Sequence, residues 1–212
     1  MLIIFLGAPG SGKGTQAKIL SPLLSFKHVS TGDMLREVSR SETDLGRELS
    51  GIMSRGELVT DDLVNKIVKE TLTKSEYKNG CILDGYPRTY SQAKFLDQIL
   101  DQEYKVIYFS LDKNKLLERI EGRYICRSCG AIYNQSTSKP KKEGVCDNCS
   151  GTEFEHRADD NAASLVKRVE VFEAESSEII NYYEQKEKLF LVKADQEVDQ
   201  VTKQIVDAVK SN

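Results

Sequence analysis

The sequence predicts an alternating α/β fold built on a central parallel β-sheet, and two observations lead to this prediction. Short apolar, β-prone runs recur along the chain, at 2–6, 81–84, 105–110 and 189–193, with a shorter one at His28 and Val29. Helical patterns lie between these runs. Strands that alternate with helices pair in parallel and bury both faces of one sheet.

The clearest helical patterns cover residues 61–73, 89–100, 113–121, 160–186 and 197–210. Thr60, Asp112 and Asp159 precede three of them, and such side chains cap the free N–H groups at the start of a helix. An earlier helix begins with TQAKIL after a glycine-rich loop. Pro22 lies within its pattern, so we expect that helix to end or kink there.

Size and composition limit the organisation and the function. A chain of 212 residues with 39% hydrophobic content can bury one substantial core that carries small inserts. The net charge of -3 argues against nucleic acid as the main partner. No apolar run approaches the roughly 20 residues of a membrane span, and no signal peptide precedes the first strand. We therefore expect a cytoplasmic protein with no membrane partner.

Residues 7–15, GAPGSGKGT, form a glycine-rich loop between a predicted strand and a predicted helix. In that setting the backbone N–H groups can point at a polyphosphate, and Lys13 can reach its outer phosphates. The usual pattern places Ser or Thr directly after the lysine, but here Gly14 stands there and Thr15 follows. A flexible loop of small residues is the alternative, and the strand and helix on either side favour a phosphate site.

Two further segments carry groups that suit phosphate and magnesium. CILDG at 81–85 is a buried-strand run that ends in Asp84, placed to hold magnesium beside the glycine-rich loop. Arg88 follows, and STGDMLR at 30–36 offers hydroxyls, a helix start and Arg36. The alternatives are a turn aspartate, a solvated arginine and a simple helix cap.

Four of the five cysteines form two CxxC pairs, CRSC at 126–129 and CDNC at 146–149, with sixteen residues between them. This spacing is typical of a zinc ribbon with Cys126, Cys129, Cys146 and Cys149 as ligands. Four unliganded thiols are the alternative. We expect structural zinc, because four protein ligands leave no open position for a reactant.

Taken together, GAPGSGKGTQA, STGDMLR, GELVTDD, LDGYPRT with Gln92, the CxxC pairs and RADD at 157–160 resemble the adenylate kinase family, in order along nearly the whole chain. In that family the loop reads GKGT, so Gly14 is the family's own variant. The resemblance implies a P-loop kinase with a core of 1–29, 60–121 and 159–212. It also implies an AMP-binding insert at 30–59 and a zinc lid at 122–158.

The implied reaction is ATP + AMP ⇌ 2 ADP, with Mg²⁺ bound to ATP, in a monomer that serves adenine nucleotide homeostasis. The resemblance assigns catalysis to Lys13, Arg88, Arg123, Arg157 and Arg168. It assigns ATP binding to Gly10, Ser11, Gly12, Lys13, Gly14, Thr15, Arg119, Arg123, Ile132, Tyr133 and Gln196. It assigns AMP binding to Thr31, Arg36, Glu57, Leu58, Val59, Gly85, Tyr86, Pro87, Arg88, Gln92, Arg157 and Arg168. It places magnesium, through water, near Thr15 and Asp84.

Chemistry agrees with these roles, because phosphoryl transfer needs two aligned nucleotides and cations on the equatorial oxygens. Thr31 and Gln92 carry the acceptor choice in the family, and an amide can present a donor and an acceptor to adenine. This sequence departs from the family at Tyr86, where Phe is usual, and in LVKAD at 191–195, which lacks a common glycine.

Two alternatives remain open at this point. The chain could be a kinase for another nucleoside monophosphate, which assays of AMP, UMP, CMP and GMP would separate. It could also be a zinc-ribbon nucleic-acid binder whose P-loop acts as a regulatory switch. A salt-dependent gel shift without phosphotransfer would indicate the second alternative.

Overall fold

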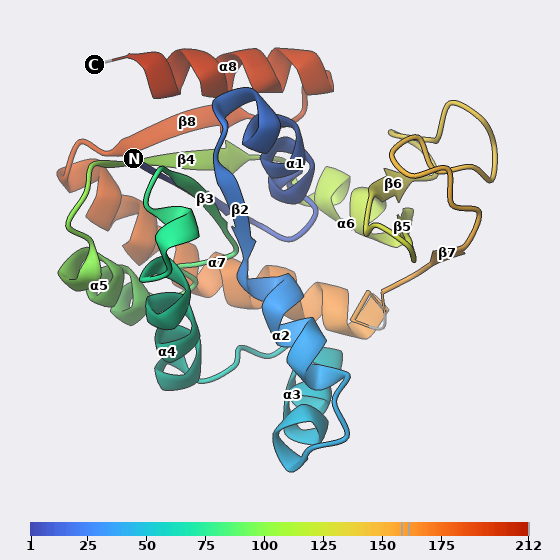
Figure 1. The fold of residues 1–212 in the computed structure, drawn as a ribbon, viewed down its shortest axis with the longest axis horizontal. Coiled ribbons are helices and arrows are strands. Elements are labelled where there is room, and N and C mark those ends of the chain that lie inside the picture. The colour runs from blue at the N-terminus through green and yellow to red at the C-terminus, as the bar shows by residue number, and fades with distance from the viewer. Residues whose placement is uncertain (158, 161, 212) are drawn as a thin grey trace.

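The computed structural model describes residues 1–157, 159–160 and 162–211, and its centre is a five-stranded parallel sheet (Figure 1). The strand order is β2-β3-β1-β4-β8. The strands are β1 (Leu2–Gly7), β2 (Lys27–Ser30), β3 (Cys81–Asp84), β4 (Tyr104–Ser110) and β8 (Leu189–Lys193). The predicted parallel α/β sheet is confirmed.

Both faces of the sheet are buried, as the continuous apolar runs require. In β1, Leu2 and Ile4 belong to one apolar cluster while Ile3 and Phe5 belong to the other. One face is covered by α1 (Lys13–Leu24) and α8 (Val198–Lys210), and the other by α4 (Asp61–Leu72), α5 (Tyr90–Ile99) and α7 (Ala162–Gln185).

The predicted helices occur with ends shifted by a few residues. Asp112 caps α6 (Lys113–Glu121) by accepting a hydrogen bond from the Asn114 amide, whereas the Thr60 side chain makes no capping bond to α4. Asp159 lies before α7, but Ala158 of the RADD motif and Asn161, in the expected first turn, lie outside the described residues.

The expectation that α1 ends at Pro22 is wrong, because the helix extends two residues further, to Leu24, and the alternative of a kink at Pro22 stays a prediction. Pro22 lies in the last turn, where the missing N–H costs one hydrogen bond and little helix remains to be disturbed. The amides of Ser25 and Phe26 then close the end by donating to the carbonyls of Pro22 and Ser21.

Two groups of elements lie away from the sheet. They fall in the stretches expected as inserts at 30–59 and 122–158, where strands and helices stop alternating. The first consists of α2 (Thr31–Ser39) and α3 (Asp44–Ser54), which project from the end of β2 (Figure 1). The second is an antiparallel sheet of β5 (Arg123–Cys126), β6 (Ile132–Asn134) and β7 (Phe154–Glu155). A short 3-10 turn, η1 (Ser75–Tyr77), precedes β3.

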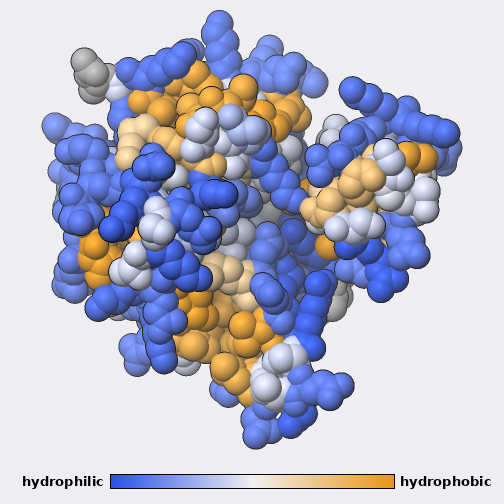
Figure 2. Space-filling view, viewed as in Figure 1, coloured by the Kyte–Doolittle hydropathy of each residue, from blue (hydrophilic) through white to orange (hydrophobic). Residues whose placement is uncertain are grey.

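The antiparallel sheet and its turns, residues 123–155, lie within the predicted 122–158 lid, and we keep the name lid for this segment. It projects from the body at the right of Figure 2, and apolar side chains occupy the part of it that faces the body. The domain boundaries expected from the sequence stay a prediction.

Candidate active site and metal centre

A cavity of about 590 Å³ opens where the carboxyl ends of the central strands meet the lid and α2. The strand register explains its position. Asp84, the last residue of β3, pairs with Phe5 of β1 and with Ser30 of β2, so the segments that follow these strands leave from one edge of the sheet. Ligands bind at such an edge in open parallel sheets.

The glycine-rich loop forms one wall of this cavity. Gly10 and Gly12 have φ values of 81° and 96°, which favour glycine. A Cβ on Gly10 would also lie 2.6 Å from Cγ1 of Ile120. The loop therefore holds its backbone in a shape that other residues would strain, with α1 starting directly after it.

Lys13 folds back onto this loop. Its Nζ donates to the carbonyls of Gly7 and Ala8, at 2.7 and 2.8 Å, and reaches the Ser11 hydroxyl at 3.3 Å. Burial lowers the pKa of Lys13 to about 8, with help from nearby arginines and opposed by Asp84. An anion in the cavity would relieve this unfavourable setting.

Gly14 stands where the usual pattern has a hydroxyl residue, and the space beside it is limited. A Cβ at this position would stand 3.3 Å from Cδ1 of Ile132 and 3.4 Å from Oδ2 of Asp84. A side chain here would therefore lie against β6 and the end of β3, and Ile132 would have to shift by a few tenths of an ångström to admit it.

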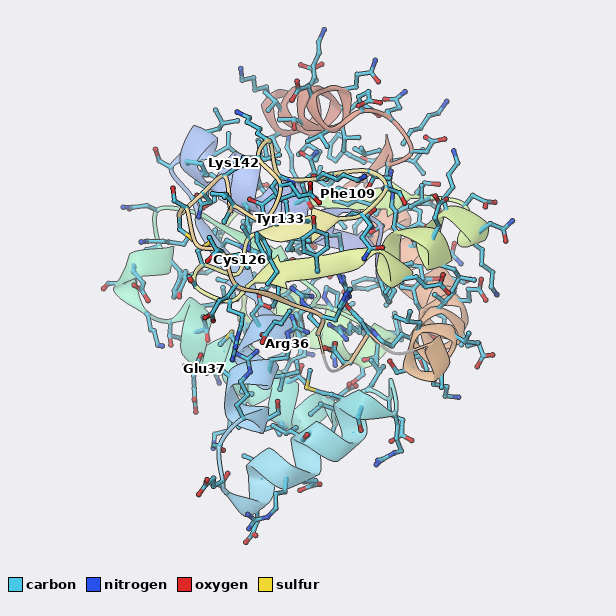
Figure 3. The ribbon with its side chains drawn as sticks, turned by 90° about the vertical axis from the view of Figure 1, so that its right-hand side faces the viewer. Arg36, Glu37, Phe109, Cys126, Tyr133 and Lys142 are labelled. Carbon is cyan, nitrogen blue, oxygen red and sulfur yellow. The ribbon has the colours of Figure 1, made fainter. Side chains whose placement is uncertain are left out.

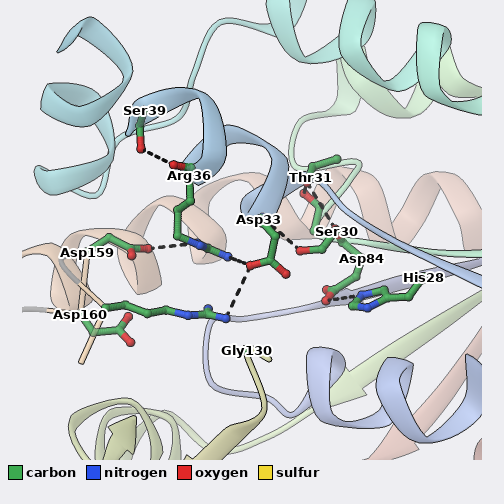
Figure 4. A network of polar contacts seen from close by, with 12 residues as sticks. His28, Ser30, Thr31, Asp33, Arg36, Ser39, Asp84, Gly130, Asp159 and Asp160 are labelled. Atoms are coloured by element: carbon green, nitrogen blue, oxygen red, sulfur yellow. Dashed lines mark hydrogen bonds and ion pairs between the residues drawn. The ribbon is translucent and has the colours of Figure 1, made fainter. Parts of the chain in front are cut away.

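Asp84 is buried at the end of β3, beside the glycine-rich loop. Its Oδ2 lies 3.3 Å from Nε2 of His28 on the neighbouring strand (Figure 4). Burial tends to raise the pKa of Asp84, but the contact with His28 and the charge of Lys13 outweigh it, so the pKa is lowered. The carboxylate is thus ionised and available to a cation or its water shell.

Arginine and aspartate side chains form a network across the cavity (Figure 4). Arg36 binds Asp33 at 2.5 Å and Asp159 at 3.4 Å. Arg157 reaches Asp33 at 3.7 Å. These ion pairs join α2 to the segment that leads from the lid into α7.

The aspartates of the RADD motif also bind the remaining two arginines. Arg123 donates to Asp160 through Nε at 2.6 Å and through Nη2. Arg168 contacts Asp159 at 3.3 Å and Asp160 at 3.1 Å. Asp160 therefore orients both Arg123 and Arg168, which share its Oδ1, and the sequence analysis did not assign this role to the aspartates.

Positive charge in the cavity is only partly balanced. Among the described residues, no carboxylate lies within ion-pair distance of Lys13 or Arg88, whose Nε donates to the Gly85 carbonyl at 2.7 Å. The buried Nε of Arg157 has no partner in the same residues. Burial and the neighbouring Arg36 and Arg123 lower the pKa of Arg157 to about 10. Such a site favours a multiply charged anion.

Gln92 is held by its neighbours at the far end of the cavity. Its Oε1 accepts a hydrogen bond from the Arg88 amide, and its Nε2 donates to Asp61, both at 2.7 Å. A primary amide has four hydrogen-bonding sites, so one N–H and one lone pair remain for a ligand. Thr31 is similarly engaged and donates to the Gly85 carbonyl at 2.9 Å.

Every residue that the sequence analysis assigned to nucleotides or magnesium lines the cavity, except Tyr86. The Tyr86 side chain is fully buried behind the wall, where its hydroxyl bonds to Asn65 and, at 3.2 Å, to the Gln92 carbonyl. The hydroxyl that Tyr86 has and phenylalanine lacks therefore helps to hold Gln92 in place.

The four paired cysteines converge at the lid. Their sulfurs all lie within 4.8 Å of one another, and the Cys126–Cys149 and Cys129–Cys146 distances are both 3.6 Å. Thiolates at 2.3 Å around a tetrahedral zinc ion are about 3.8 Å apart, so this arrangement fits zinc. The predicted clustering is confirmed, and zinc itself stays a prediction.

The two CxxC turns have the same backbone design. The amide of Cys126 donates to the Ala131 carbonyl, and that of Cys146 to the Gly151 carbonyl, each at 2.9 Å. Burial raises the pKa of Cys146, but hydrogen bonds from the Tyr133 hydroxyl and from the amides of Asn148 and Cys149 lower it overall to about 6. The turns therefore bring the four sulfurs to a shared point.

None of the described helices has the length and apolar character needed to cross a membrane.

Comparison with known proteins adds an independent finding. A model of the adenylate kinase family matches residues 5–188. The chain is 46% identical to an adenylate kinase of Thermosipho africanus over 99% of this chain and 100% of that relative. It is 44% identical to an adenylate kinase of Caldicellulosiruptor bescii over 99% of each chain. It is 40% identical to one of Rickettsia africae over 94% of this chain and 95% of the relative.

Proposed function

The chain belongs to the adenylate kinase family, and we propose that its cation-rich cavity transfers a phosphoryl group in line between two bound nucleotides. As an adenylate kinase enzyme, it converts ATP and AMP reversibly into two ADP. The observation that carries the proposal is the unbalanced positive charge. Lys13 and Arg88 lack a carboxylate partner among the described residues, and Arg157 keeps a buried, unpartnered Nε. The phosphates of two nucleotides would supply the missing negative charge.

The transfer needs positioning and charge stabilisation more than proton transfer. The acceptor oxygen of AMP is already ionised at neutral pH, so no general base is required. Lys13, Arg123, Arg157 and Arg168 stabilise the charge on the transferring phosphoryl group. The carboxylates of Asp159 and Asp160 fix several of these cations before substrate arrives, which lowers the reorganisation needed in the reaction.

The two ends of the cavity take different nucleotides. Arg36 and Arg88 hold the phosphate of AMP, and Thr31 and Gln92 face its base. The loop residues Gly10 to Thr15 bind the phosphates of ATP, and Arg119, Ile132, Tyr133 and Gln196 surround its adenosine. The lining of a single cavity by all of these residues supports the assignment.

Adenylate kinases use Mg²⁺ with ATP, and bound magnesium neutralises part of the phosphate charge. The ionised Asp84 and the nearby Thr15 would hold its water shell, because Gly14 has no hydroxyl to bind it directly. His28 orients the Asp84 carboxylate from the neighbouring strand.

The segments at 30–59 and 122–158 serve as an AMP-binding insert and a lid. The ion pair of Asp33 with Arg157 joins the two regions over the cavity, and that of Arg36 with Asp159 ties the insert to the residue that follows the lid segment, which would exclude water during transfer. Zinc on the four cysteines stabilises the lid and has no open coordination position for chemistry. We propose a cytoplasmic monomer with nucleotides as its only ligands besides metals.

A side-by-side assay of AMP, UMP, CMP and GMP with MgATP tests the acceptor assignment. We expect AMP to be the preferred acceptor by about 10⁴-fold in kcat/KM, the discrimination expected when a hydrogen-bonding site is left unpaired. Gln92→Leu should lose this preference while ATP binding persists. Equal use of UMP or CMP by the parent protein would contradict the assignment.

A further inference from the structure

Tyr133 lies between the metal centre and the nucleotide cavity. It is the middle residue of β6, is only 6% exposed and still forms part of the cavity wall. Its ring stacks on Tyr124 at 5.8 Å and meets Phe154 edge-on at 5.6 Å. Figure 3 places Tyr133 and Cys126 on the paired strands of the lid.

The hydroxyl of Tyr133 has two partners, which together fix the direction of its hydrogen. The Asp147 amide donates to the hydroxyl oxygen at 2.7 Å. The hydroxyl hydrogen is therefore free to be donated, and Sγ of Cys146 lies 3.3 Å away. A phenol that donates to a thiolate ligand orients it and raises the stability of the metal complex.

The neighbours of Tyr133 on the same strand touch the nucleotide machinery. Cδ1 of Ile132 packs beside Gly14 of the glycine-rich loop, and Asn134 pairs with Arg123 across the lid sheet. A shift of this short strand would therefore move contacts at the metal centre and at the phosphate site together.

We propose that Tyr133 is a positioning residue that couples the four-cysteine metal centre to the nucleotide cavity. The proposal rests on the proposed nucleotide site for one of its two ends. With zinc bound, the Tyr133 hydroxyl donates to the Cys146 thiolate and holds β6 in place. A nucleotide in the cavity restrains the same strand from the other side, so by linkage zinc and nucleotide each strengthen the binding of the other.

The test compares Tyr133→Phe with the matched control Tyr124→Phe. Tyr124 stands opposite Tyr133 on the paired strand β5. Among the described residues, its hydroxyl makes no hydrogen bond to a cysteine of the metal centre. Zinc release from the purified, zinc-loaded proteins to a coloured chelator is followed with and without ATP. We expect Tyr133→Phe to release zinc about 10 to 100 times faster than the parent, and Tyr124→Phe to match the parent.

ATP should slow the release from the parent and from Tyr124→Phe, and slow it clearly less in Tyr133→Phe. Zinc release at parental rate in Tyr133→Phe, or equal slowing by ATP in all three proteins, overturns the proposal. The release measured without ATP does not depend on phosphotransfer, so a failure of the proposed function remains distinguishable from a failure of this coupling.

Thermal unfolding separates this role from simple packing. After zinc is stripped, Tyr133→Phe should melt near the stripped parent, because the Tyr133–Cys146 hydrogen bond then no longer supports a ligand of a bound ion. With zinc bound, the variant should melt clearly lower than the parent. An equal drop in melting temperature with zinc and without zinc would show that the hydroxyl serves packing only, and it would contradict the proposal.

Discussion

Binding of ATP should draw a proton onto Lys13, and the structure sets the size of the effect. The pKa of Lys13 in the free protein is about 8, mainly because its ammonium group is buried. The phosphates of ATP would return the pKa toward its ordinary value near 10.4. The expected uptake per ATP is therefore about 0.1 proton at pH 7, about 0.5 at pH 8 and about 0.9 at pH 9.

Isothermal titration calorimetry measures this uptake. ATP binding is titrated at each pH in two buffers with different ionisation enthalpies, and the difference in observed heat gives the number of protons exchanged. Lys13→Met is the control and should lack the pH-dependent uptake. Equal heats in both buffers at pH 8 and 9, or the same uptake in Lys13→Met, would show that ATP binding does not protonate Lys13.

The same depressed pKa affects stability. Between about pH 8 and the unfolded value near 10.4, the unfolded chain binds more protons at Lys13 than the folded chain does. The Lys13 contribution to the free energy of unfolding therefore rises with pH across this window, and below it the burial of the charge is a constant cost.

Three further predictions follow from the site. Lys13→Met should lower kcat by roughly two to three orders of magnitude in a folded protein, since it removes one preorganised cation; near-normal turnover would refute its role. Arg88→Ala should raise the KM for AMP and leave ATP affinity, measured by titration, nearly unchanged; a collapse of ATP affinity alone would reverse the assignment. Replacing Cys129 and Cys149 with serine should release zinc and lower the thermal midpoint while phosphotransfer persists at low temperature; metal analysis and melting check this, and a parental midpoint would contradict it.

Much of the fold could be predicted because its signals are local. The buried strands read as continuous apolar runs, and the cap at Asp112 depends on residues two positions apart. Pro22 was misjudged because its effect depends on how close it lies to the end of α1, and helix ends are the least certain feature of a sequence pattern.

The support of the site could not be predicted, because it depends on contacts between distant segments. His28 meets Asp84 only because β2 is the neighbour of β3, which the chain order does not reveal. Asp159 is bound to Arg36, 123 positions away. The aspartates in RADD and STGDMLR stand near arginines in the sequence, which indicates ion pairs. Which arginine each aspartate binds is determined only in the folded chain.

Arg157 offers the sharpest test of whether unbalanced buried cations in the cavity stabilise the transferring phosphoryl group. Its Nε is buried without a partner among the described residues, whereas Arg47 on α3 is exposed and pairs with Asp44 on the surface. The measurement is kcat for ADP formation from MgATP and AMP in Arg157→Ala and in the control Arg47→Ala, with melting curves for both. We expect a loss of roughly a thousandfold for Arg157→Ala and a parental rate for the control. A folded Arg157→Ala protein with kcat within a few-fold of the parent would contradict this role of the buried cations.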